Sequence, residues 1–183
     1  QSHYQMLAGV CIEFCVVTRR LDLLFSEIYQ CFRNTGYTAV FLDVLEPYVL
    51  NDKLKYIAPD VMSEFIDHYK ALGDVSTVER CLLHMDVTIM NFDSILSLLR
   101  KNFLFSALIH VYTQGLDDYL SPLEILFDAY FDAADLEVVE MRDHPNVFSQ
   151  PSSFQRYGYK ILLYLRHCLT RKSFPTGSDI APE

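Results

Sequence analysis

The sequence of 183 residues has no tryptophan and only six glycines, each isolated from the others. This isolation excludes the glycine-rich loops that hold phosphates in nucleotide-binding proteins. The Gly-x-Ser-x-Gly elbow of the α/β-hydrolases is also missing. The sequence therefore contains no motif for nucleotide binding or for ester hydrolysis.

Basic residues are scarce. Fifteen lysines and arginines stand against 24 aspartates and glutamates, which gives a net charge of −9. The densest basic groups are three pairs, Arg19–Arg20, Arg100–Lys101 and Arg171–Lys172. Nucleic acids and anionic lipids are bound by clustered positive charge. The composition therefore argues against both as direct partners.

Long apolar runs are missing as well, because Glu13, Asp22 and His110 interrupt the most apolar windows. No window reaches the roughly 18 apolar residues that a membrane span needs. No secretory signal pattern is recognised, and the five cysteines are an odd number, as expected for free thiols in a reducing compartment. We expect a cytosolic protein, and because the first residue is not Met, a fragment.

The pattern that is present is helical, since apolar residues recur every three or four positions between turn signals. Gly36 and Gly73 are expected to end helices, and Asn91 to begin one. Ser76 with Glu79, Ser121 with Glu124, and Ser152 with Gln155 have the spacing of capping boxes. Pro47 is expected to end or kink its helix. The expected helices span residues 4–17, 21–33, 38–45, 61–72, 91–101, 104–114, 121–131 and 154–171, with a further helix from residue 76.

The first and last of these helices carry clear apolar stripes. Leu7, Cys11, Phe14 and Cys15 share a face of the first helix. Ile161, Leu162, Leu165 and Leu169 form the stripe of the last. The first helix is apolar around most of its circumference, because Met6, Val10, Val16 and Val17 lie outside its stripe. A helix inside a longer array would have such a surface, and we expect the isolated chain to self-associate through it.

A degenerate repeat points to the architecture. A shift of about 30 residues pairs Phe65 with Ile95, Tyr69 with Leu99 and Val78 with Leu108. Helical hairpins that match in this way can stack, because no single hairpin covers its own apolar face. The sequence predicts an all-α fold, an α-solenoid of stacked helical hairpins.

Composition divides the chain into four parts. Residues 1–134 are expected to form the array of hairpins, and residues 154–174 a long closing helix. Between them, residues 135–153 combine acidic residues with two prolines, which predicts a mobile inserted loop. Residues 175–183 contain Pro175, Gly177 and Pro182 and are expected to be a linker to further protein.

Candidates for chemistry are few. Cys11 and Cys15 could share a metal, but a structural zinc site needs four ligands and no second pair is spaced for it. His68, His84 and His110 are far apart in the sequence, and Asp117–Asp118 lie in a short connection where solvated carboxylates are common. We therefore expect no enzyme, no cofactor, and no catalytic, cofactor-binding or metal residues. The residues that bind a partner are not assigned.

Several runs of residues resemble a known family. They are VMSEFIDHYKALGDVSTVERCLLHMDVTIMNFDSILSLL (61–99), FSALIHVYTQGLDDYLSPLEILF (105–127), YVLNDKLKYIAPDVM (48–62) and YKILLYLRHCLTRKSFPTG (159–177). In this order they are similar to the solenoid of the vacuolar protein sorting-associated protein eight family, subunits of the CORVET tethering complex. The resemblance covers residues 42–131 and 157–177. It is most specific in CLLHMD and ALIHVYTQGLDDYLSPLE.

The resemblance implies a large subunit with an N-terminal β-propeller, a long α-solenoid and a C-terminal zinc-binding RING-type domain. Such a subunit joins the core vacuolar sorting proteins and works with a Rab GTPase and SNAREs in transport to endosome and vacuole or lysosome. It lies on the cytosolic face of early and late endosomes. Alternatives are a HOPS-like or clathrin-like coat or tether segment and a stand-alone helical adaptor. The motif is one of packing, so no functional residue follows from it.

Overall fold

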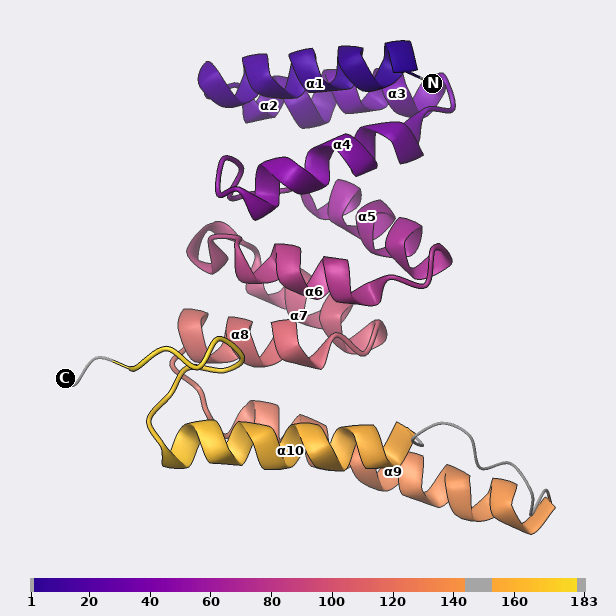
Figure 1. Cartoon of the computed structure of the whole chain (residues 1–183), viewed down its shortest axis with the longest axis vertical. Coiled ribbons are helices and arrows are strands. Elements are labelled where there is room, and N and C mark those ends of the chain that lie inside the picture. Colours follow the sequence, from indigo (N-terminus) through magenta and orange to yellow (C-terminus); the bar gives the residue numbers. More distant parts are fainter. Residues whose placement is uncertain (1, 144–152, 181–183) are drawn as a thin grey trace. The chain divides into compact units, whose positions relative to one another are not determined.

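The computed structural model describes residues 2–143 and 153–180 (Figure 1). Of these residues 74% are helical, and the described part of the chain contains no β-strand. The all-α prediction is therefore confirmed, and the helices are those of a TPR-like solenoid. The chain divides into two compact units, residues 1–107 and 108–183.

Unit 1 begins with α1 (Ser2–Val17), which packs on α4 (Thr38–Leu50). Between them lie α2 (Leu21–Leu23), a π-helical turn (Leu24–Ile28) and α3 (Tyr29–Asn34), which follow one another without a break. The helix that contains Pro47 continues to Leu50, so the expected end near residue 45 is wrong. Tyr48 donates a hydrogen bond from Oη to the Gly9 carbonyl at 3.2 Å and so ties α4 to α1.

The rest of unit 1 consists of α5 (Pro59–Ala71), α6 (Val75–Leu83), a 3₁₀ turn (Val87–Ile89) and α7 (Phe92–Lys101). Helix α5 packs against α6 and α7, and α4 packs against α5 and α6. Gly36 and Gly73 follow the ends of their helices with φ of 78° and 74°, a left-handed conformation that glycine adopts without steric cost. Both expected helix stops are thus confirmed.

Helix α8 (Phe105–Gly115) starts in unit 1 and ends in unit 2. Unit 2 is dominated by the hairpin of α9 (Ser121–Asp143) and α10 (Ser153–Leu169). Tyr164 is buried in this hairpin and donates from Oη to the Tyr119 carbonyl at 2.8 Å. Phe174 packs edge-on against the Tyr164 ring.

The last described residues form a local turn. Residues 171–180 fold back on themselves, because Ile180 N donates to the Arg171 carbonyl and Ser173 N to the Ser178 carbonyl. The linker to further protein at residues 175–183 stays a prediction.

Helix α9 also continues well beyond residue 131, so the prediction of a loop is wrong for residues 135–143. Acidic residues such as Asp135 do not prevent a helix, because Glu, Leu, Met and Arg in the same stretch are good helix formers. The remainder of the expected mobile loop, residues 144–152, lies outside the described residues, and so does Ser152 of its capping box.

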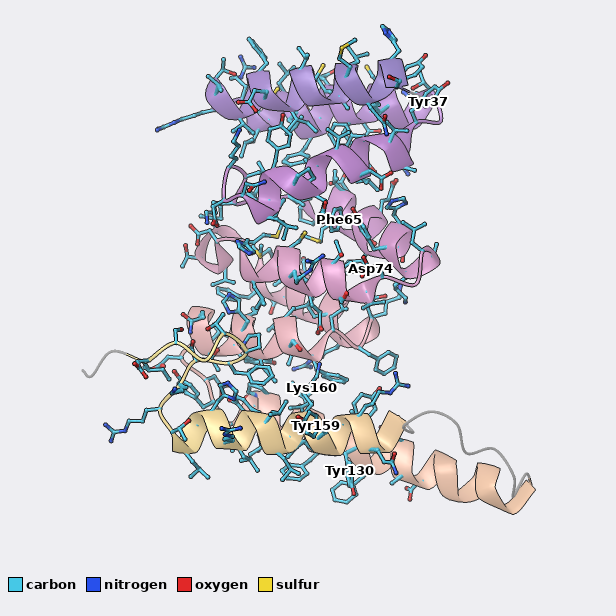
Figure 2. The ribbon with its side chains drawn as sticks, in the orientation of Figure 1. Tyr37, Phe65, Asp74, Tyr130, Tyr159 and Lys160 are labelled. Atoms are coloured by element: carbon cyan, nitrogen blue, oxygen red, sulfur yellow. The ribbon has the colours of Figure 1, made fainter. Side chains whose placement is uncertain are left out.

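Helix starts are capped by carboxylates and an amide rather than by the expected serines. Asp74, labelled in Figure 2, caps α6 by accepting from Thr77 N at 3.2 Å. The Ser76 hydroxyl donates to the same carboxylate. Before α9, Asp118 accepts from Ser121 N at 3.0 Å and from the Ser121 hydroxyl. Both serine boxes are therefore wrong in detail, while the cap at Asn91, which accepts from Ser94 N, is confirmed.

The core of each unit is aliphatic and aromatic, as Phe65 in Figure 2 illustrates. Positions related by the repeat have the same burial, for Phe65 and Ile95, Tyr69 and Leu99, and Val78 and Leu108 are all buried. The side chains with at most 2% exposure include Ile12, Leu24, Tyr29, Phe41, Leu42, Leu45, Phe65, Ile66, Leu82, Leu99 and Tyr164.

Candidate protein-interaction surfaces

Two of the five cysteines, Cys15 and Cys81, are core residues, while Cys31 is exposed. Cys15 is fully buried, and burial raises the pKa of its thiol. Burial, with the nearby Glu46 charge, raises the pKa of Cys81 to about 12. No group of three or more His, Cys, Asp or Glu side chains suited to a metal occurs among the described residues. The two thiols are thus kept protonated and unreactive at neutral pH.

The three candidate histidines, His68, His84 and His110, lie on different elements. His68 Nε2 lies 2.7 Å from Asp43 Oδ1 and links α5 to α4. His84 Nδ1 lies 3.2 Å from Asp52 Oδ1. His110 is half-buried in α8, and desolvation lowers its pKa. These contacts join neighbouring helices and loops, which is a structural role.

The Asp117–Asp118 pair is part of the turn before α9. Asp118 accepts three hydrogen bonds from Leu120 N, Ser121 N and the Ser121 hydroxyl. These bonds lower the pKa of its carboxyl. Asp117 has a positive φ of 51° in the same turn. The pair therefore shapes the turn at the start of α9.

The most exposed apolar surface of unit 1 is on α1, and we call it the α1 outer face. Its residues are Met6, Val10, Phe14 and Val17, whose side chains are 66%, 63%, 57% and 71% exposed. At 100° per residue these positions fall within about 80° of the helix circumference. The opposite face carries the buried Ala8, Ile12 and Cys15 and packs on α4 and the π-helical turn.

This arrangement corrects the expected stripe of the first helix. Cys15 is buried, but Leu7 and Phe14 are exposed. A helix that is apolar on all sides gives no sequence signal for the face that packs inward. The inner face of α1 carries Ala8, Ile12 and Cys15, and the small side chains of Ala8 and Cys15 allow a close approach to neighbouring elements.

Unit 2 has an exposed apolar set of its own on the α9–α10 hairpin. It comprises Phe131 on α9 with Tyr159, Leu162 and Leu169 on α10. The expected stripe of the last helix is therefore wrong for Leu162 and Leu169, since α10 instead buries Ile161 and Tyr164. The hairpin leaves large side chains in solvent while its inner face is filled.

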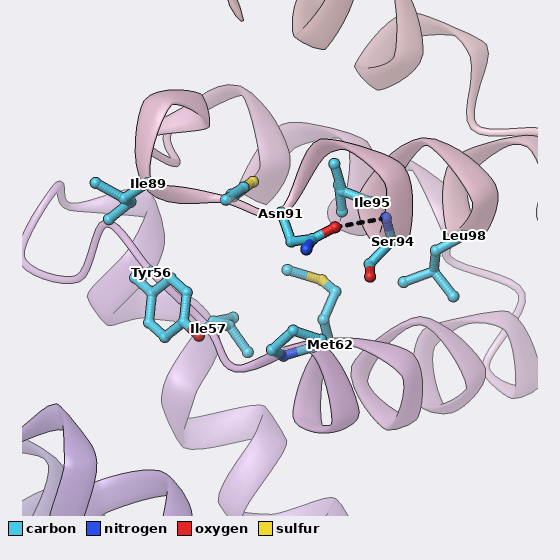
Figure 3. A pocket seen from close by; sticks show the side chains of 10 residues that line it. Tyr56, Ile57, Met62, Ile89, Asn91, Ser94, Ile95 and Leu98 are labelled. Atoms are coloured by element: carbon cyan, nitrogen blue, oxygen red, sulfur yellow. Dashed lines mark hydrogen bonds between the residues drawn. The ribbon is translucent and has the colours of Figure 1, made fainter.

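Two adjoining hollows lie in unit 1 and share Tyr56, and we call them together the Tyr56 groove. The first has a volume of about 250 Å³. The buried Met62 of α5 and Ile95 of α7 line it from opposite sides, and the exposed Ile89 also lines it (Figure 3). The second, of about 360 Å³, lies along α2 and the π-helical turn. The groove could not be predicted from the sequence, because its walls come from helices, a 3₁₀ turn and the connection at residues 56–58.

None of the helices among the described residues has the length and apolarity needed to cross a lipid bilayer.

Comparison with known proteins is consistent over the whole chain. Residues 40–183 match the family model described as Vps8 central TPR. The human vacuolar protein sorting-associated protein 8 homolog is 32% identical over all of this chain, which spans 12% of that relative's length. The Saccharomyces cerevisiae vacuolar protein sorting-associated protein 8 is 24% identical over 98% of this chain, and the match covers 14% of that relative's length. No solved structure gives a significant match. The chain therefore belongs to the Vps8 family.

Proposed function

We propose that this chain is a non-catalytic scaffold segment of a CORVET-like endosomal tethering subunit. It acts in vesicle-mediated protein transport to endosome and vacuole or lysosome. Its relatives are named as vacuolar protein sorting proteins. In the full-length protein the segment holds the parts on either side at a fixed distance, and other tethering subunits, a Rab GTPase and SNAREs engage the whole protein on the cytosolic face of endosomes.

The observation that carries the proposal is the α1 outer face. A repeat array buries its apolar surfaces only by stacking each hairpin on its neighbours. Met6, Val10 and Phe14 are arranged as such a contact surface, while α1 is already packed on its other side. The chain spans only 12% of the human relative, so most of the longer protein is available to cover this face.

The polar groups support a structural role. The His68–Asp43 and His84–Asp52 contacts join adjacent segments of unit 1. Asp74 and Asp118 hold helix starts. Side chains that could take part in chemistry are thus occupied in maintaining the helical array.

The test is a replacement in cells that lack the human relative. The human protein carries this chain in place of its matching segment, and delivery of a lysosomal hydrolase and co-purification of tethering subunits are measured. We expect the replacement to restore both. The double substitution Met6→Gln and Val10→Gln should reduce both, because it makes the contact surface polar while leaving the buried side of α1 unchanged.

His68→Gln and His84→Gln serve as the matched variants for chemistry. We expect each variant to retain hydrolase delivery, with any loss no larger than the loss of folded protein. If either abolished delivery while the protein remained folded and bound to its subunits, the non-catalytic assignment would be wrong.

A further inference from the structure

We propose that the Tyr56 groove is a docking site for a peptide segment of another protein, one that carries a bulky apolar side chain followed or preceded by basic residues. The site goes beyond the scaffold role, since it lies on unit 1 away from the α1 outer face. The proposal rests on the shape, lining and charge of the two hollows.

The first hollow supplies an apolar seat. It is lined by the buried Ile57 and Met62 on one side and by the buried Ile95 on the other, with Ile89 and Leu98 also in its lining (Figure 3). Its volume of about 250 Å³ has room for one or two large side chains rather than for a typical small-molecule ligand. Ile89 is more than half exposed, and burial of such a residue on binding is favourable.

Polar groups at the same hollow suit a peptide backbone. The Asn91 side chain uses Oδ1 to cap α7, with 3.0 Å to Ser94 N, and this orients its NH₂ group toward the hollow (Figure 3). The Ser94 hydroxyl lies beside it (Figure 3). Both can donate to the carbonyl groups of a bound peptide, which fixes its direction.

The second hollow supplies charge of one sign. Asp22 and Asp60 line it, and no lysine or arginine lines either hollow among the described residues. The Arg20 guanidinium lies outside the hollow and bonds Asp22 at 3.1 and 3.2 Å, so it offsets part of this charge. Asp60 is exposed in the first turn of α5.

This charge distribution selects among occupants. An anionic lipid headgroup or a nucleic acid would bring phosphates against two carboxylates, which is unfavourable. A second copy of this chain, with a net charge of −9, is a poor source of basic residues. A segment with Lys or Arg a few positions from an apolar side chain can place the apolar group in the first hollow and the basic group in the second. The net negative charge of the chain attracts such a segment over longer distance.

The experiment is a selection from a phage-displayed library of random 12-residue peptides on the 183-residue chain. We expect enriched sequences to share a Leu, Ile, Phe or Met within a few positions of Lys or Arg. A synthetic peptide of the enriched sequence is then titrated by fluorescence anisotropy. Enrichment of acidic sequences, or of none, would overturn the proposal.

Variants locate the binding. Ile89→Glu should weaken the peptide by about tenfold or more, because it puts a charge into the apolar seat. Asp60→Asn should weaken it about two- to fivefold, as for an exposed ion pair, and Asp60→Glu should restore it. Leu72→Gln, an exposed apolar position elsewhere on unit 1, is the control and should bind normally. Thermal melts monitored by circular dichroism establish that each variant is folded.

Two results would contradict the proposal. Unchanged affinity in Ile89→Glu and Asp60→Asn would place the peptide elsewhere on the chain and refute the site. Self-association that is lost in Ile89→Glu would make a second copy the occupant and refute the choice of partner. Neither result bears on hydrolase delivery, so the scaffold proposal is tested separately.

Discussion

Replacing Met6 and Val10 with glutamine should dissolve an association that the isolated chain makes through the α1 outer face. Fully burying a side chain of this size is worth roughly 1.5–3 kcal/mol. Met6 is 66% exposed and Val10 63%, so each can contribute about 1–2 kcal/mol. In a two-fold dimer each position counts twice. With about half of this area covered, the double substitution removes roughly 2–4 kcal/mol and weakens the dimer roughly 30- to 700-fold.

Sedimentation velocity is the assay, with the chain at about 1 to 100 µM, a range that corresponds to association free energies near −8 to −5 kcal/mol. We expect the wild type to shift from monomer to dimer within this range and the double variant to remain monomeric. Glutamine is a good helix former, so α1 itself should persist. Far-UV circular dichroism should be the same for both proteins.

Leu72→Gln is the matched control, because Leu72 is as exposed as Val10 but lies at the end of α5. It should leave the association unchanged. A wild type that stays monomeric over the whole range would refute the reasoning. A dimer that survives the double substitution would place the contact on another surface.

Three further outcomes are expected. Asp74→Ala should lower the free energy of unfolding in urea by about 1–2 kcal/mol, because the cap of α6 is lost. The control is Asp67→Ala, which removes an exposed carboxylate inside α5 and should change the free energy little. Equal losses in the two variants would contradict the role of Asp74 as a cap. Cys31, which is exposed, should react with iodoacetamide at pH 8 well before Cys81, whose pKa is about 12, and unfolding in urea should abolish the difference. The pKa of His110 is lowered in the folded chain, so the unfolded chain binds a proton more readily at this residue. The contribution of His110 to stability is therefore present above its unfolded pKa and is lost as pH falls below about 6.5. His110→Gln should flatten that part of the profile of unfolding free energy against pH, and an unchanged profile would show that His110 is not the group responsible.

The family and the helical class could be predicted from the sequence because both rest on local patterns. Apolar residues at helical spacing, Gly36 and Gly73 after their helices, and Asn91 before α7 act over a few residues only. The resemblance to the Vps8 family rests on runs of adjacent residues and is confirmed. The loop expected at residues 135–143 is wrong, because an acidic composition does not prevent a helix where the neighbouring residues have high helix propensity.

The choice of helix caps was beyond local reasoning. Ser76 and Asp74 are both good capping residues, and the helix is capped two residues earlier than expected, at Asp74. Glu79, which would have completed a box with Ser76, instead accepts from Ser106 N in the first turn of α8 at 2.8 Å. A partner 27 residues away in the sequence leaves no local signal.

The sequence by itself determined that the chain is helical, acidic and a member of its family, because composition, periodicity and motif order are properties of the chain alone. Only the tertiary structure decided which side of α1 is buried and where the Tyr56 groove opens. Met6 and Ile12 are equally apolar, and the packing of α4 and the π-helical turn puts one outside and the other inside. The groove, likewise, exists because Met62, Ile89 and Leu98 meet across three elements, and such a meeting is a property of the fold.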